Sequence, residues 1–316
     1  YFEKLDQISE LAKLQTIGYT HEHRPKIILT ITSAQHMGNL EQIRQKQLQL
    51  ADPSQPMPEV ANMPSIIHQG YGVHGNEPSS AEAAMLTAYW LLASQSDLAK
   101  NLRENSVVHI DPTVNPDGRD RHSLWANSNK GFPAVADPLD REHNETWPGG
   151  RTNHYWFDLN RDWLPLAHPE SKAKISWYHQ WYPNVTTDFH EMGPNSTYFF
   201  EPTKPYGSEN PVVPRKNYDD INPKFAKYFA KYMDKIGSLY WSKEVFDNSY
   251  PGYGSSYPDM HGGLGLVFET ASSRGHIQSS QRGDLTFAFT IRNHVVNSLA
   301  TMEAALDNRV YMHEYL

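Results

Sequence analysis

Residues 65–92 read SIIHQGYGVHGNEPSSAEAAMLTAYWLL and contain the segment that decides the fold. Ser65–Tyr71 is a candidate for a short strand. Ser79 and Glu82 have the spacing of a capping box, which marks the start of a helix. The run Ala83–Leu92 that follows is apolar on nearly every face, which predicts a buried helix. A strand, a turn and a helix in this order form a unit of α/β sheets.

The rest of the chain alternates strand and helix patterns. The predicted strands cover residues 26–32, 106–110, 185–190 and 265–269, and the predicted helices cover residues 2–14, 169–182, 222–236 and 284–306. Residues 52–64 and 127–155 are rich in loop-forming residues and are expected to be surface loops. The alternation predicts an α/β fold with a mixed, mostly parallel central sheet and helices on both faces. We expect a single domain over residues 1–316, cut from a longer precursor because the chain begins at Tyr1 rather than Met.

The composition excludes several kinds of site and partner. With 28 Lys and Arg against 36 Asp and Glu, the formal net charge of −8 is opposite to that of nucleic-acid-binding surfaces, so no nucleic-acid partner is expected. No apolar run approaches the roughly 18–20 residues that a membrane span needs. There is no cysteine, which leaves 16 histidines and the carboxylates as the strong metal ligands.

The turn after the first predicted parallel strand carries two metal-binding residue types. His74 and Glu77 are three residues apart in GVHGNEPS. Ligands of open α/β sheets bind at the carboxyl ends of the strands. A catalytic zinc site uses three nitrogen or oxygen donors and one water, and His190, at the end of the predicted strand 185–190, is the candidate for the third. Alone, His-x-x-Glu is a weak motif that also fits a surface turn.

Other phrases in the chain raise the specificity of this motif. They are Gly18–Thr20 with Arg24–Pro25, Asn115–Gly118 (NPDG), Asp158–Arg161 (DLNR), Phe189–Glu191 (FHE) and Phe268–Glu269. Together and in this order they resemble the zinc metallocarboxypeptidases of the carboxypeptidase A/B family, from about residue 1 to residue 307. The resemblance implies a zinc carboxypeptidase-like α/β/α sandwich as a single catalytic domain. It also implies one Zn²⁺ per chain, held by His74, Glu77 and His190.

The resemblance also assigns residues around the metal. Asp158 would orient His74 from outside the metal's coordination sphere, as carboxylates commonly do for metal-bound imidazoles. Asn160 and Arg161 would bind the free C-terminal carboxylate of the substrate, because a planar guanidinium can donate two parallel hydrogen bonds to a carboxylate.

The remaining assignments concern the reaction itself. Glu269 would be the general base. Tyr250, preferred over two other tyrosines of its loop, would close over the substrate. The family also uses an Arg downstream of the NPDG phrase to polarise the scissile carbonyl. This sequence departs from that pattern, since Lys130 is the cation nearest the expected offset and Arg121 is the second candidate.

These assignments predict a secreted or periplasmic enzyme that removes the C-terminal residue of peptides. A zinc deacylase or amidase, acting on acyl-amino acids or peptidoglycan peptides, is the alternative on the same fold, and a binding domain that has lost catalysis is a third. Residues 255–258 are uncharged, which weakly favours apolar or neutral C-terminal side chains in the substrate. The natural substrate and the oligomeric state stay open.

Overall fold

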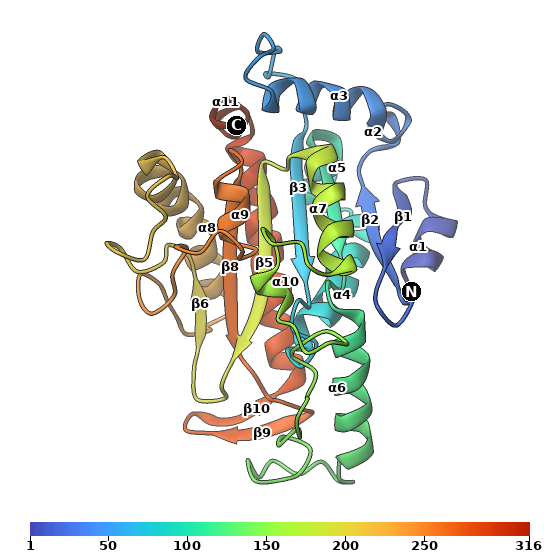
Figure 1. Cartoon of the computed structure of the whole chain (residues 1–316), viewed down its shortest axis with the longest axis vertical. Coiled ribbons are helices and arrows are strands. Elements are labelled where there is room, and N and C mark those ends of the chain that lie inside the picture. Colours follow the sequence, from blue (N-terminus) through green and yellow to red (C-terminus); the bar gives the residue numbers. More distant parts are fainter.

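An eight-stranded sheet runs through the molecule in the order β1-β2-β4-β3-β5-β8-β6-β7 (Figure 1). The structure is a computed structural model that describes residues 1–316. The strands are β1 (Ala12–Tyr19), β2 (Pro25–Ile31), β3 (Ser65–Tyr71), β4 (Ser106–Asp111), β5 (Val185–Met192), β6 (Tyr198–Phe200), β7 (Tyr240–Trp241) and β8 (Leu264–Ala271). The four central strands β4, β3, β5 and β8 are parallel. Strand β1 pairs antiparallel with β2, β2 with β4 and β6 with β8, while β7 pairs parallel with β6. This confirms a mixed sheet with a parallel centre.

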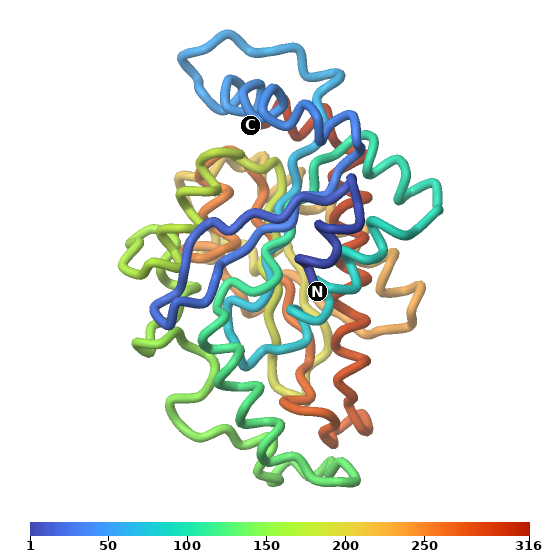
Figure 2. The backbone as a smooth tube through the Cα atoms, turned by 90° about the vertical axis from the view of Figure 1, so that its right-hand side faces the viewer, coloured from blue at the N-terminus to red at the C-terminus, as the bar shows by residue number.

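Helices cover both faces of the sheet. They are α1 (Phe2–Ile8), α2 (Ala34–Gly38), α3 (Leu40–Ala51), α4 (Ser79–Ala93), α5 (Asp97–Asn105), α6 (Pro116–Asn129), α7 (Pro169–Trp181), α8 (Asn222–Lys235), α9 (Ser256–Asp259), α10 (Phe287–Asp307) and α11 (Arg309–Tyr315). In Figure 2 the sheet is seen from its β1 side, with α10 on one face and α7 on the other. A small hairpin of β9 (Ile277–Ser280) and β10 (Gly283–Thr286) lies outside the main sheet.

The core lies in two parts, one on each face of the sheet. Ile66 and Ile67 are neighbours in β3, yet Ile66 packs with Trp177 of α7, whereas Ile67 belongs to the cluster of α4, α8 and α10. Successive side chains of a strand point to opposite faces. Both faces are therefore buried, as is usual for parallel strands. Tyr71 and Phe268 stack on either side of Phe189, each with ring centroids 4.8 Å apart, and so join β3, β5 and β8.

Several sequence expectations were wrong in detail. The helix expected over residues 2–14 ends at Ile8, and residues 12–19 form the edge strand β1. Ser79 does not form a capping box, because its hydroxyl and backbone N–H donate to Glu191. The last long helix begins at Phe287 rather than at residue 284, which belongs to β10. Helix α6 was not predicted at all.

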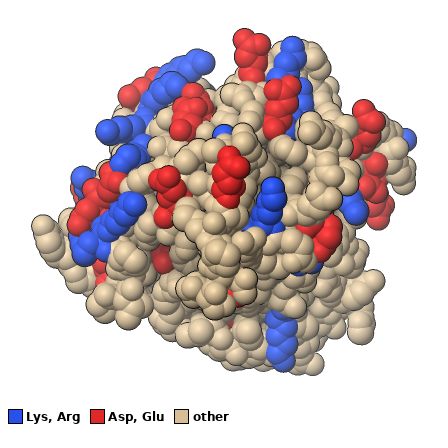
Figure 3. All heavy atoms as spheres, turned by 90° about the horizontal axis from the view of Figure 1, so that it is seen from above, with Lys and Arg blue, Asp and Glu red and all other residues tan.

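Two features of the structure bear on a membrane or nucleic-acid partner: the apolar character of its helices and the distribution of charge on its surface. No helix has both the length and the apolar character needed to cross a bilayer. On the face seen from above, acidic and basic side chains are interspersed (Figure 3). That face therefore lacks the continuous basic area by which proteins hold a phosphate backbone.

His68 of β3 makes the stability of the fold sensitive to acid. It is 1% exposed, and neither of its ring nitrogens has a partner. Burial, with the nearby Lys174 and Lys26, lowers the pKa of His68 to about 3. The unfolded chain therefore binds a proton below about pH 6.5 that the folded chain rejects, so stability falls as the pH drops through that range.

We expect His68→Phe to remove the contribution of His68 to this acid sensitivity. At about pH 5 the variant should be more stable than the parent by about 2 kcal/mol beyond any difference at neutral pH. Urea unfolding of both proteins at the two pH values measures this. If the free energies of unfolding of the parent and the variant change equally with pH across the acid range, the prediction is wrong.

Candidate active site

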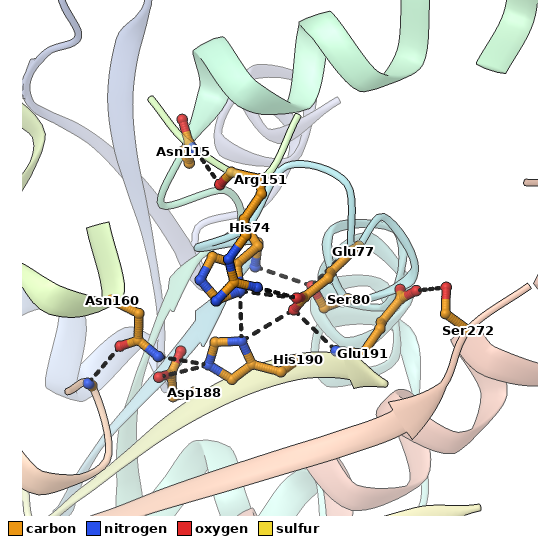
Figure 4. A network of polar contacts seen from close by, with 12 residues as sticks. His74, Glu77, Ser80, Asn115, Arg151, Asn160, Asp188, His190, Glu191 and Ser272 are labelled. Atoms are coloured by element: carbon orange, nitrogen blue, oxygen red, sulfur yellow. Dashed lines mark hydrogen bonds and ion pairs between the residues drawn. The ribbon is translucent and has the colours of Figure 1, made fainter. Parts of the chain in front are cut away.

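Three donor groups meet where β3 and β5 end. His74 and Glu77 lie in the turn between β3 and α4, and His190 lies near the end of β5, the neighbouring parallel strand. His74 Nδ1 is 2.9 Å from Glu77 Oε1 and 3.2 Å from His190 Nδ1, and His190 Nδ1 is 3.1 Å from Glu77 Oε2 (Figure 4). All three residues are buried. These are the three residues that the sequence analysis proposed as metal ligands, and the structure places them together.

The outer nitrogen of each imidazole faces a carboxylate. His74 Nε2 is 2.9 Å from Asp158 Oδ1, as expected, and His190 Nε2 is 2.8 Å from Asp188 Oδ2. Asn160 Nδ2 also lies 3.0 Å from His190 Nε2, but the nearer, charged carboxylate decides where the proton is held. Both Nδ1 lone pairs then point at each other and at Glu77.

A cation between these converging lone pairs would stabilise them. Two imidazole nitrogens and a carboxylate are the donor set of catalytic zinc sites with an open position. The electrostatics agree, because burial lowers the pKa of His190 but Asp188 and Glu77 outweigh it and raise that pKa well above its usual value. Burial likewise raises the pKa of Glu77, but the two imidazoles hold it well below its usual range. The residues present fit one Zn²⁺.

Asp188 was missed by the sequence reasoning, although a signal for it exists. It stands two residues before His190 on β5, and residues two apart point to the same face of a strand. An acidic residue at that spacing before a ligand histidine is therefore a candidate partner for its second nitrogen.

We expect Asp158→Asn to lower the affinity for zinc about 10- to 100-fold. The amide keeps the shape of the side chain but no longer offers a negative charge to His74 Nε2. Competition with a chromophoric chelator measures the change. Asp97→Asn, at an exposed position in α5, is the control, and an equal affinity in both variants would contradict the role of Asp158.

A cavity of about 300 Å³ opens beside these donors. Its lining residues are His74, Glu77, Arg151, Asn160, Arg161, His190, Glu191, Met192, Phe246, Asp247, Tyr253, Ser255, Val267 and Glu269. Asn160 is fixed there because its Oδ1 accepts the N–H of Gly254 at 2.8 Å. The guanidinium of Arg161 lies 4.6 Å from the ring centroid of Tyr253, and its side chain is 49% exposed. The cavity therefore carries a cationic group beside the donor set, and the nearest carboxylate oxygen to it is Asp158 Oδ2 at 3.9 Å.

Glu269 and His190 lie side by side on adjacent strands. The parallel register of β5 and β8 pairs them directly. Burial raises the pKa of Glu269 to about 8, with His190 acting in the opposite direction. A carboxyl whose pKa is shifted toward neutrality in a cavity is suited to take and return a proton.

Neither cation predicted for the carbonyl-polarising role lines the cavity. Lys130 ends α6, where its Nζ contacts Asn127 Oδ1 at 3.2 Å. The Arg121 guanidinium donates to the carbonyl oxygens of Gly149, Thr152 and Asn153, and so holds the loop over residues 149–153. The unpredicted helix α6 therefore takes these side chains away from the cavity.

Arg151, which the sequence analysis did not single out, lines the cavity instead. Its guanidinium lies 3.3 Å from Glu77 Oε1 (Figure 4). It also lies 2.9 Å from Asp158 Oδ2, and its side chain is 44% exposed. The loop that presents it has no periodic pattern, so no sequence signal gave its position.

The tyrosine at the cavity is Tyr253 rather than Tyr250. Tyr250 lies outside the lining and donates its hydroxyl to the carbonyl oxygen of Arg161 at 3.1 Å. The ring centroids of Tyr250 and Tyr253 are 5.2 Å apart, with the rings in an edge-to-face arrangement. Both tyrosines thus contact Arg161, Tyr250 at its backbone carbonyl and Tyr253 at its guanidinium.

Glu191 fixes the donor turn to the sheet. Its backbone N–H donates to Glu77 Oε2 at 3.0 Å, and its carboxyl group accepts from the backbone N–H of Ser79 at 2.6 Å and from the hydroxyls of Ser79 and Ser272. Burial raises the pKa of Glu191. The residue after His190 therefore ties β5 to the start of α4.

A sheet flanked by helices, with an N, N, O donor triad at its strand ends and a carboxyl group beside it, defines the class of zinc-dependent hydrolases. The chain belongs to the zinc carboxypeptidase family, whose family model matches residues 1–279.

Known proteins of that family share its fold with this chain. The chain is 31% identical to carboxypeptidase SOL1 of Arabidopsis thaliana over 121 residues, which cover 38% of this chain and 21% of that protein. It is 25% identical to carboxypeptidase 2 of Trichophyton rubrum over 171 residues, which cover 52% of this chain and 26% of that protein. The chain thus matches about a quarter of the length of these relatives.

Among solved structures, the metallo-carboxypeptidase from Burkholderia cenocepacia superposes with a TM-score of 0.66 at 16% identity, over 98% of this chain and 68% of that one. The carboxypeptidase A from Helicoverpa armigera gives a TM-score of 0.60 at 15% identity, over 99% of this chain and 71% of that one. The α/β/α architecture expected from the sequence is confirmed.

Proposed function

We propose that the chain is a zinc-dependent carboxypeptidase that hydrolyses the last peptide bond of a substrate with a free C-terminus. One observation carries the proposal. The guanidinium of Arg161, free of strong ion pairs, lines the same 300 Å³ cavity as the donor triad and Glu269. An internal peptide bond brings no carboxylate for this group, whereas a chain terminus does.

The residues divide the work by position. Arg161 and Asn160 bind the terminal carboxylate and fix the scissile bond beside the triad. Arg151, whose guanidinium lies 3.3 Å from Glu77 Oε1, stabilises negative charge that develops on the carbonyl oxygen. Glu269 takes a proton from the attacking water and returns it to the leaving amine. When bound to the triad, zinc supplies a Lewis acid that activates water at neutral pH.

Hydrolysis of N-blocked dipeptides tests the proposal. The protein should release the C-terminal residue, lose this activity on treatment with a chelator, and regain it with added zinc. A series with the C-terminal residue varied gives the side-chain preference. Release of amino acids from acyl-amino acids, but not from blocked dipeptides, would support the deacylase alternative.

If the zinc-loaded protein hydrolyses none of these substrates, the remaining alternative is a binding domain that has lost catalysis. Retention of all three donors and Glu269 argues against that reading. Action outside the cytoplasm stays a prediction from the family resemblance.

A further inference from the structure

We propose that the chain holds a second divalent cation of the zinc type, at a site that shares no residue with the proposed catalytic triad. Its ligands would be His21, His168 and Glu170. Each offers a donor atom, and these atoms lie within 4.8 Å of one another. His21 is in the turn between β1 and β2, while His168 and Glu170 flank the first residue of α7.

Glu170 carries the argument. Its side chain is fully buried, at 0% exposure. Oε1 accepts one long hydrogen bond, 3.3 Å from the backbone N–H of His21, and Oε2 has no partner. No lysine or arginine forms an ion pair with this carboxylate. A buried carboxylate without a counter-charge is costly, and buried charges are normally paired or coordinate a metal.

Two imidazoles offer their nitrogens beside this carboxylate. His21 Nε2 is 3.1 Å from His168 Nδ1, a separation close to that of the two histidine nitrogens in the proposed catalytic triad. His168 is held rigidly, because its backbone N–H donates to Asp162 Oδ2 at 3.0 Å and its ring packs 4.4 Å from that of Phe157. The ligand geometry is thus preformed on one side of the site.

The donor set selects the class of cation. Two imidazole nitrogens and one carboxylate oxygen favour zinc over calcium or magnesium, which prefer oxygen ligands. His21 is only half-buried, so a water molecule can take the fourth position from the solvent side.

Such a cation would have a structural role. It would join the β1–β2 turn to the start of α7. His21 and His168, in these two segments, are 147 residues apart in the sequence. Asp162, which positions His168, follows directly after Arg161. The second cation would therefore brace the segment that carries the proposed carboxylate-binding pair.

Zinc stoichiometry tests the proposal without an activity assay. The protein is stripped with a chelator, reloaded with zinc, freed of unbound metal and analysed for metal per chain. We expect two zinc ions in the parent, and one in each of His21→Ala, Glu170→Gln and His190→Ala. The double variant His21→Ala/His190→Ala should bind none.

His23→Asn is the matched control. It changes an exposed histidine of the same turn whose φ of 61° suits asparagine, and it should keep two zinc ions. Circular dichroism will show whether His21→Ala folds. If it does not, Glu170→Gln keeps the test valid, because glutamine has nearly the same shape as glutamate.

Thermal unfolding gives a second readout. In His190→Ala, zinc at about 100 times Kd should raise Tm by about 5 °C, and the double variant should show no shift. One zinc ion in the parent, unchanged in His21→Ala and Glu170→Gln, would overturn the proposal. Because these readouts are metal content and Tm, a failure of the proposed catalytic function would not imitate that result.

Discussion

Glu269→Gln should reduce the turnover of a C-terminal peptide bond by about 10²- to 10⁴-fold, the usual contribution of general acid–base catalysis. The amide fills the same space beside His190 but cannot accept a proton. Zinc content should equal that of the parent, since Glu269 is not one of the three donors. Measurement of kcat and of bound zinc on the same samples separates the two effects.

The pH profile sharpens this test. In the parent, kcat/KM should fall as the pH drops below the pKa of Glu269, because the base must be ionised to act. Burial raises that pKa to about 8, and a bound cation would lower it. The variant should lose this acid limb. Asp247→Asn, a carboxylate change in the same cavity, is the control, and activity of Glu269→Gln within a few-fold of the parent would exclude Glu269 as the base.

Arg161→Ala should lower kcat/KM on substrates with a free C-terminus by roughly 30- to several-thousand-fold. Loss of one partner of a hydrogen-bonded charge pair costs about 2–5 kcal/mol, at tenfold for about each 1.4 kcal/mol. The kcat/KM of Arg161→Lys should lie between those of the parent and Arg161→Ala, because an ammonium keeps the charge but lacks the two-pronged geometry of a guanidinium.

Amidated peptides give the decisive comparison. The parent should already reject them, so Arg161→Ala should narrow the gap between free and amidated substrates by slowing only the former. Equal cleavage of both forms by the parent would remove the carboxylate-binding role of Asn160 and Arg161, and would favour the amidase alternative.

The parallel centre of the sheet and the donor triad could be predicted from sequence because their signals are local. The apolar run of β3 ends just before His74, and β5 ends near His190, so the rule that ligands bind at carboxyl strand ends placed both. Strand β1 was missed because apolar residues recur every three positions from Phe2 to Leu14, and this helical spacing runs into the first residues of the strand.

Helix α6 was missed because the NPDG phrase has turn-forming composition. In the structure Asn115 caps that helix, its Oδ1 accepting the N–H of Gly118 at 3.0 Å, and Pro116 stands in the first turn. Asn followed by Pro is itself a helix-start signal. Arg151 had no such signal, since its position depends on Arg121 contacts made after the loop has folded.

The order of strands in the sheet has a consequence for biosynthesis. Strand β8 pairs with β5 on one side and β6 on the other, although both precede it along the chain. Until residue 271 leaves the ribosome, a nascent chain keeps unpaired edges on both, and such edges favour aggregation. The same insertion brings Glu269 beside His190. An unfinished chain therefore lacks the proposed general base beside the donor triad, and the proposed activity would begin only when the sheet closes.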